Sequence, residues 1–309
     1  MPSIPRLSLA QQISLTIIPA VAGALSVLGS SSIIWTIAKD WKLKTANIKN
    51  RFLLGLCLSN LVNSLWFIVW SLPIPAGSPD VWGAIGNNTT CQIQGFWLQM
   101  GCAGSFYNGA LSLYFLMSLR YSLSDSEISR RYEAWCHIIA IMWPLCTAVT
   151  AASLNLFTVT GLGCWMSPQP PYCQLKSTDY ECTEHKHAYI YSWMFTGVPL
   201  VILILFISFC MFQIYMAVRE ITNKAQSHIF RGVENQERDH EENSTDDFPS
   251  VTTSGSPSAS NLSARLKERK KETAYQAFLY VAAFVFTHCF SISKLLPWLK
   301  HRCIRPTSC

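Results

Sequence analysis

The distribution of charge along the chain is the sequence feature that most constrains its fold. Only 14% of the 309 residues are charged, whereas a soluble domain carries about 25%. Asp, Glu, Lys and Arg are absent from six windows, at residues 7–38, 52–79, 81–119, 134–175, 187–218 and 273–293. Each window can hold the roughly 20 residues of a spanning helix, and an ionised side chain at mid-bilayer costs about 2.5–3.5 kcal/mol. The pattern therefore predicts an all-α fold, a polytopic transmembrane helix bundle.

The chain is expected to form one membrane domain over residues 1–309. We place its six predicted spans at about residues 13–38, 52–72, 91–119, 135–157, 189–218 and 273–295. A long loop, 219–272, precedes the last span and contains basic ends, an acidic patch and a Ser/Thr-rich stretch. Its low hydrophobicity predicts partial disorder. Its serines and threonines are either phosphate acceptors or part of a plain flexible linker.

The short connecting loops differ in their content of Lys and Arg. The first, around 39–51, is strongly basic, the second, 73–90, has neither residue type, and the third carries three arginines. The positive-inside rule then places the N-terminus outside and the 219–272 loop in the cytoplasm, and we expect a multi-pass protein of the plasma membrane. Overlapping glycosylation sequons at Asn87 and Asn88 agree with an outer second loop. Such triplets also occur at Asn243 and Asn261, in the loop placed inside.

Four cysteines, Cys91, Cys164, Cys173 and Cys182, fall on predicted outer loops or outer helix ends. An even number of cysteines in the oxidising compartment favours disulfides, and four allow three pairings. We favour a Cys91–Cys164 bridge, which ties the fourth loop over the mouth of the bundle. Cys173 and Cys182 would then close a small loop. Unpaired thiols are the alternative.

Two short motifs resemble a known group of receptors. A bridge from the head of the third helix to the loop after the fourth is typical of seven-helix G-protein-coupled receptors. Gly-Cys-Trp-Met at 163–166 and Cys-Gln-Ile-Gln-Gly-Phe at 91–96 are similar to the secretin-like and cyclic-AMP-receptor-like members of that group. The resemblance covers roughly residues 25–295. It implies an extracellular ligand site and a cytoplasmic site for a heterotrimeric G protein.

Within this resemblance, Arg120 and Tyr121 are candidates for contact with a G-protein helix, because they end the third span at its cytoplasmic face. In rhodopsin-like receptors an acidic residue precedes this pair, whereas Leu119 precedes it here, so we do not carry over that ionic lock. The simpler alternative is a topology-setting arginine beside an interfacial tyrosine.

Polar side chains inside the spans should face the bundle interior and find partners there. They are Asn60, Asn63, Tyr107, Asn108 and His137. Each either makes a structural hydrogen bond or contacts a ligand. As ligand or switch candidates we select Tyr107 and Asn108, together with Trp165, which follows Cys164 in the fourth loop.

Other functional classes fit the sequence poorly. We expect no catalytic residues, metal site, cofactor or nucleic-acid partner, because no span carries paired carboxylates and no His-Glu-x-x-His motif is present. An arginine ladder typical of a voltage sensor is also missing. Beyond ligand and G protein, the expected partner is membrane lipid, which the basic stretches flanking the long loop can contact.

The C-terminal tail departs from the pattern, since it is basic on the side where the rule expects few basic residues, and no seventh apolar window follows. Our leading hypothesis is a receptor that lacks its last helix because its C-terminus is truncated or mis-predicted; a misread window is a further explanation. One alternative is a six-span transporter or channel subunit. Another is a truncated paralogue that does not signal and is retained in the endoplasmic reticulum.

Overall fold

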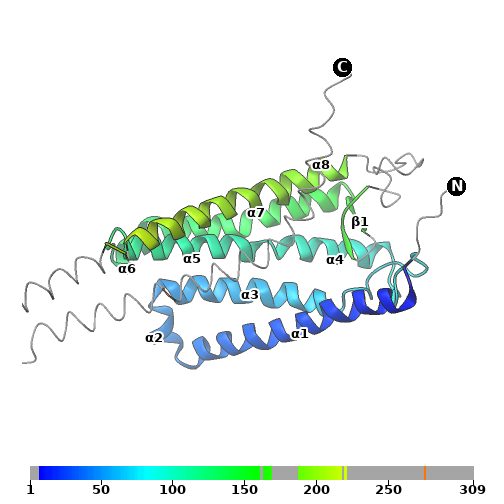
Figure 1. Ribbon diagram of the computed structural model, residues 1–309, viewed down its shortest axis with the longest axis horizontal. Coiled ribbons are helices and arrows are strands. Elements are labelled where there is room, and N and C mark those ends of the chain that lie inside the picture. Colours follow the sequence, from blue (N-terminus) through cyan, green and yellow to red (C-terminus); the bar gives the residue numbers. More distant parts are fainter. Residues whose placement is uncertain (1–6, 161–162, 169–186, 218, 221–274, 276–309) are drawn as a thin grey trace, which may run out of the picture. The chain divides into compact units, whose positions relative to one another are not determined.

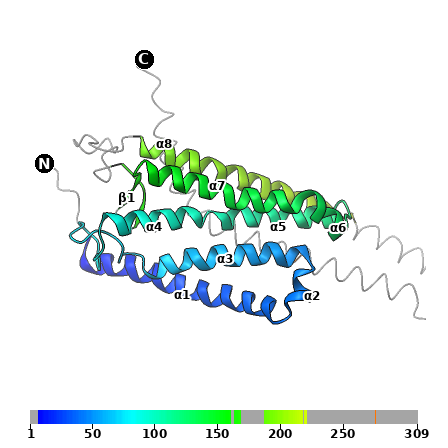
Figure 2. The ribbon, with the colours of Figure 1, turned by 180° about the vertical axis from the view of Figure 1, so that it is seen from behind.

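The computed structural model describes residues 7–160, 163–168, 187–217, 219–220 and 275. The chain divides into two compact units, Met1–Leu111 with Asp125–Phe206, and Ser112–Ser124 with Ile207–Cys309. The first unit contains most of the described helices and a small hairpin (Figures 1 and 2). The predicted span at 273–295 and most of the long loop before it lie outside the described residues.

Helices α1 (Leu9–Lys39) and α3 (Ile48–Ile68) lie side by side in the first unit, joined by the short helix α2 (Trp41–Thr45) (Figures 1 and 2). α1 begins at a capping box in which the Ser8 side chain accepts from the backbone N–H of Gln11, an arrangement that satisfies two otherwise unpaired donors. The side chain of Asn47 caps α3 with a single hydrogen bond, which it accepts from the backbone N–H of Lys49. The second predicted span therefore begins about one turn earlier in the structure.

A small residue allows α1 and α3 to approach each other closely. A Cβ atom at Gly23 would lie 2.7 Å from the carbonyl oxygen of Ser64 and 3.1 Å from the backbone nitrogen of Ile68. The hydroxyls of Ser26 and Ser64 also bond across this contact at 2.7 Å. Such small-residue contacts are typical of helix packing in membranes. A Cβ at Gly29 in the same helix would meet open space.

The third predicted span, 91–119, consists of two helices, α4 (Asn88–Met100) and α5 (Ala103–Leu119). The interruption falls at Gly101, where a Cβ atom would lie 2.6 Å from the Asn63 side chain of α3. Glycine is a weak helix former, and here its missing side chain makes room for the Asn63 amide. The helix of this predicted span is therefore interrupted at residues 101–102.

The fourth span begins earlier and ends earlier than predicted. α6 (Asp125–Ile128), the π-helical turn η1 (Ser129–Glu133) and α7 (Ala134–Ser153) form one continuous helix. It ends because Asn155 adopts a left-handed conformation, with φ 52°, which asparagine tolerates better than most residues. The chain then forms strands β1 (Phe157–Val159) and β2 (Cys164–Met166), which pair as an antiparallel hairpin. The all-α expectation did not include this hairpin.

The fifth span starts as α8 (Ala188–Ser192) and passes through a second π-helical turn, η2 (Trp193–Gly197). It continues as one apolar helix over Ala188–Ala217. Within the described residues, four helices are long and apolar enough to cross a membrane: Leu9–Lys39, Ile48–Ile68, Asp125–Ser153 and Ala188–Ala217. Together they confirm the polytopic helical bundle.

Candidate functional site

The β1–β2 hairpin is covalently attached to the start of α4. A disulfide joins Cys91 on α4 to Cys164 on β2, and both residues are buried. This is the pairing that we favoured from the sequence. Cys173 and Cys182, for which we expected a second bridge, lie outside the described residues.

Two glutamines of α4 add polar contacts to this attachment. Gln92 donates to the Phe157 carbonyl of β1 at 2.9 Å. Gln94, which is fully buried, donates to the Trp70 carbonyl at 2.8 Å and accepts from the backbone N–H of Cys164 at 3.3 Å. The hairpin is therefore held at both strands, and α4 provides its base.

The close fit of the hairpin depends on a glycine. A Cβ atom at Gly95 would lie 2.5 Å from the ring of Phe157, and Phe157 is itself buried. The aromatic ring thus packs directly on the α4 backbone. Together with the disulfide, this contact fixes the hairpin against α4.

One buried side chain, Gln99 on α4, connects four elements. Its Nε2 donates to Thr147 Oγ1 of α7 at 2.9 Å. Its Oε1 accepts from Trp165 Nε1 of β2 at 3.3 Å and from Thr196 Oγ1 of η2 at 3.0 Å. A carbonyl oxygen has two acceptor positions, so both are occupied. The hydrogen bonds of Gln99 therefore join the hairpin to α4, α7 and the fifth helix.

A second contact joins α7 to the π-helical turn η2. The indole Nε1 of Trp143 donates to the carbonyl oxygen of Phe195 at 3.1 Å. A π-helical turn departs from the regular α-helical hydrogen-bond ladder, and this indole supplies a partner for one of its carbonyls. The position of η2 is thus set by Trp143 and by Gln99.

Arg120 follows α5 directly in the second unit. Its Nη1 forms an ion pair with Oε2 of Glu220 at 3.1 Å. The two side chains are 41% and 50% exposed, and exposed pairs of this kind contribute about 0.2–1 kcal/mol. Tyr121, next in the chain, is exposed. Arg120 is therefore engaged, but by a weak contact that a competing partner can replace.

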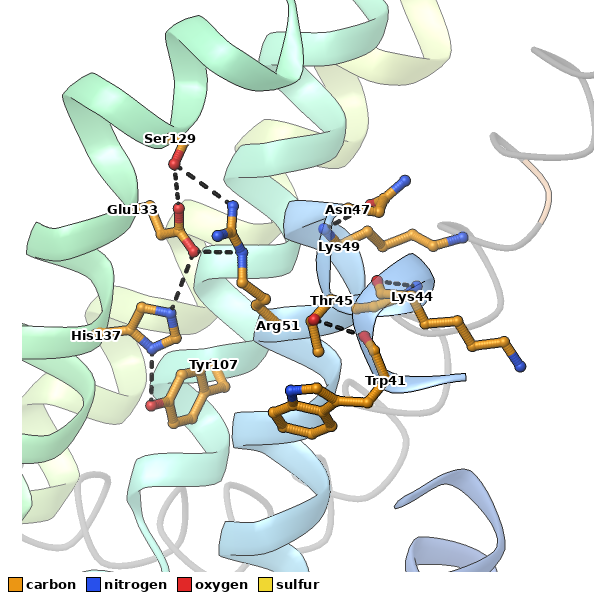
Figure 3. Close-up of polar contacts among 11 residues, drawn as sticks. Trp41, Lys44, Thr45, Asn47, Lys49, Arg51, Tyr107, Ser129, Glu133 and His137 are labelled. Atoms are coloured by element: carbon orange, nitrogen blue, oxygen red, sulfur yellow. Dashed lines mark hydrogen bonds and ion pairs between the residues drawn. The ribbon is translucent and has the colours of Figure 1, made fainter. Parts of the chain in front are cut away.

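A separate polar network joins α3, α5 and α7 (Figure 3). Arg51 Nε lies 2.8 Å from Glu133 Oε1, and Ser129 donates to the other carboxylate oxygen of Glu133. His137 Nε2 lies 3.8 Å from Glu133 Oε1, and His137 Nδ1 lies 3.1 Å from the Tyr107 hydroxyl. Among the described residues, no group of three or more His, Cys, Asp and Glu could hold a metal ion.

A family model described as "7 transmembrane receptor (rhodopsin family)" matches residues 29–305. The chain belongs to this receptor family. This is a family of receptors and not of enzymes. A comparison with curated proteins gave no match.

The receptor's family corrects one expectation from the sequence. The secretin-like and cyclic-AMP-receptor-like assignment was wrong, since the matching model is that of the rhodopsin family. The misleading signals were the short motifs at 163–166 and 91–96. Both surround the disulfide, and their residues serve to hold the hairpin, which makes them poor markers of one receptor family.

The receptor does not bring the three predicted ligand or switch residues together. Trp165 lies on the hairpin and bonds to Gln99. Tyr107 belongs to the His137 network on α5, and Asn108 beside it is half-buried. The predicted glycan acceptors Asn87 and Asn88 are both exposed at the start of α4, where the Asn87 side chain also caps the helix.

The sequence analysis missed Gln99 and its partners Thr147 and Thr196. A signal was present, because Gln94 and Gln99 are amides within an apolar window, and such groups should face the bundle interior. The threonines offered no comparable signal, since a threonine in a helix commonly bonds to its own backbone. Thr147 does so as well as bonding to Gln99.

Proposed function

We propose that this receptor detects an extracellular ligand at the β1–β2 hairpin and signals to a heterotrimeric G protein at the end of α5. The observation that carries the proposal is the set of hydrogen bonds around Gln99. Through them, the hairpin residue Trp165 is linked to Thr196 in the fifth helix. A ligand that moves the indole changes the contacts of the fifth helix, and this helix runs on to Ala217, close in sequence to Glu220.

The ligand that suits this end of the receptor is uncharged. Windows 81–119, 134–175 and 187–218 contain no Asp, Glu, Lys or Arg, so the interiors of these spans offer no counter-ion. The groups near the hairpin are indoles, hydroxyls and amides, which recognise hydrogen-bonding and apolar surfaces. A buried charge without a partner is costly, so a charged ligand would need partners from the loops.

The proposal requires the hairpin to face the outside of the cell, and glycosylation tests this orientation. Peptide-N-glycosidase should shift the mobility of the chain made in mammalian cells. The double variant Asn88→Gln, Thr89→Ala should abolish the shift, because it removes both sequons and keeps the Asn87–Thr90 capping box. Variants at Asn243 and Asn261 are the controls. A shift that depends on those two asparagines would place the long loop outside and contradict the orientation.

Arg120 and Tyr121 form the proposed G-protein site at the end of α5. In the present state Arg120 is paired with Glu220, so a G protein must take over its guanidinium. We expect Glu220→Gln to raise basal nucleotide exchange on a G protein by up to about fivefold, the factor that corresponds to about 1 kcal/mol for an exposed pair. The measurement uses the full chain in lipid nanodiscs with a panel of purified G-protein classes.

Two further variants complete this experiment. Arg120→Gln should abolish exchange, because it removes the proposed contact. Arg130→Gln, at an exposed arginine on η1, should leave exchange unchanged and controls for lost positive charge. Unchanged exchange in Glu220→Gln together with full exchange in Arg120→Gln would contradict G-protein coupling at this site.

A further inference from the structure

The carboxylate of Glu133 is shared by two basic side chains on different helices. Arg51 on α3 approaches Oε1 to 2.8 Å, and His137, one turn further along the helix of Glu133, approaches the same oxygen to 3.8 Å. The Glu133 side chain is only 11% exposed, so these partners, rather than water, stabilise its negative charge. Figure 3 shows the carboxylate lying between the two.

Groups from three elements contact the imidazole of His137, whose side chain is 32% exposed. Nδ1 faces the buried Tyr107 hydroxyl on α5, and the ring of Phe52 on α3 packs at a centroid distance of 5.2 Å. In the described part of the chain, the titratable and charged groups around the imidazole are Glu133, Arg51 and Tyr107. The neutral ring fits this arrangement when Nε2 carries the proton toward Glu133 and Nδ1 accepts from Tyr107.

Adding a proton to His137 changes the charge balance of this cluster. With a neutral imidazole, one carboxylate balances one guanidinium. With an imidazolium, two partly exposed cations compete for the single, nearly buried carboxylate of Glu133. The proton also occupies Nδ1, so the Tyr107 hydroxyl loses its acceptor. Protonation thus favours pairing of Glu133 with His137 at the expense of Arg51.

The helix is built so that Glu133 can change partners. Glu133 is the last residue of the π-helical turn η1, and single π-helical turns often occur at functional sites. Glu133 and His137 are spaced i,i+4, the spacing at which side chains meet on a regular α-helix. Conversion of η1 to a regular turn would rotate Glu133 by about 100°, one residue of a 3.6-residue helix. That rotation would move the carboxylate relative to Arg51.

We propose that Arg51, Glu133, His137 and Tyr107 form a proton-controlled latch between α3, α5 and α7. With neutral His137, Glu133 holds Arg51 and the latch is closed. Protonation of His137 draws Glu133 to its own helix and opens the contact to α3. A histidine is suited to this role because it is the side chain whose unperturbed pKa places its charge change between about pH 5 and 8. The inference is independent of the ligand and of the G protein.

The test is hydrogen exchange of the full chain in lipid nanodiscs, measured by mass spectrometry across the pH range and corrected for intrinsic chemical exchange. We expect severalfold faster opening of the segments around Arg51 and around η1 in acid. His137→Gln should abolish this acceleration. His187→Gln, at an exposed histidine beside α8, should keep it and serves as the matched control.

Two other variants separate the latch from a general loss of stability. Glu133→Gln should give fast opening at every pH, since the shared carboxylate is gone. Tyr107→Phe keeps the ring and should move the midpoint of the pH response. The proposal is overturned if the corrected exchange rates of these segments in the wild-type chain are equal at all pH values. It is also overturned if the His137→Gln variant still exchanges faster in acid.

Discussion

Replacing Cys91 and Cys164 together by alanine is expected to lower the free energy of unfolding by about 4 kcal/mol, the value for a loop of this length. The bond closes a sequence separation of 73 residues, so its loss restores much conformational freedom to the unfolded chain. It also removes the covalent tie between the hairpin and α4. We expect a large fall in the melting temperature of the purified chain and a loss of ligand response.

The single variants provide an internal check. Cys91→Ala and Cys164→Ala should each cost nearly as much as the double variant, because either change breaks the same bond. Cys146→Ala, at an exposed free cysteine of α7, should leave the melting temperature within error. A double variant that loses twice as much as each single variant would contradict the pairing of these two cysteines.

Replacing Gln99 by alanine is expected to have the next largest effect. The change leaves the Trp165 indole, the Thr196 hydroxyl and the Thr147 hydroxyl without their shared partner. Unpaired buried polar groups cost about 1–3 kcal/mol each, but Trp165 and Thr196 are only partly buried, and Thr147 retains a bond to its own helix. We therefore expect a loss of about 2–4 kcal/mol and a weaker response to ligand, measured by melting and by G-protein activation.

Two threonines of α7 give a matched comparison for this prediction. Thr147→Ala removes one bond to Gln99 and should lower the melting temperature measurably. Thr150→Ala should have little effect, because its exposed hydroxyl bonds to the Cys146 carbonyl of its own helix. Equal effects of the two threonine variants would show that Gln99 does not carry the coupling.

Much of the helical framework was predictable because charge is a strong constraint in lipid. The windows around α1, α3 and the fifth helix follow from the cost of ionised groups in the bilayer. The hairpin was not predictable in this way, since residues 134–175 are free of charge throughout. Absence of charge does not distinguish a helix from the short strands at 157–159 and 164–166. The available clue was the residue type of Asn155, which tolerates the left-handed conformation that ends the fourth helix before β1.

The candidate site was predictable only in part, for a geometric reason. The disulfide could be anticipated because cysteines have one favoured reaction in the oxidising compartment. The partners of Gln99 depend on the rotation of each helix about its axis, and spans of this composition do not specify it. His137 and Tyr107 were recognised as polar residues, but Glu133 and Arg51 were interpreted only as loop charges. The pairing of Arg51 with Glu133 depends on how α3 and η1 lie beside each other, which the sequence does not specify.

The occupied oxygen of Gln99 has a consequence for how the receptor can respond. Because Oε1 already accepts from Trp165 and Thr196, a ligand donor cannot simply be added there and must substitute for one of them. Binding at this amide would then be an exchange of partners. Substitution for Trp165 would leave the fifth helix bonded to Gln99 and free the Trp165 indole, whereas substitution for Thr196 would keep the indole bonded and release the fifth helix from Gln99. Two ligands that reach the same amide could in this way produce opposite responses.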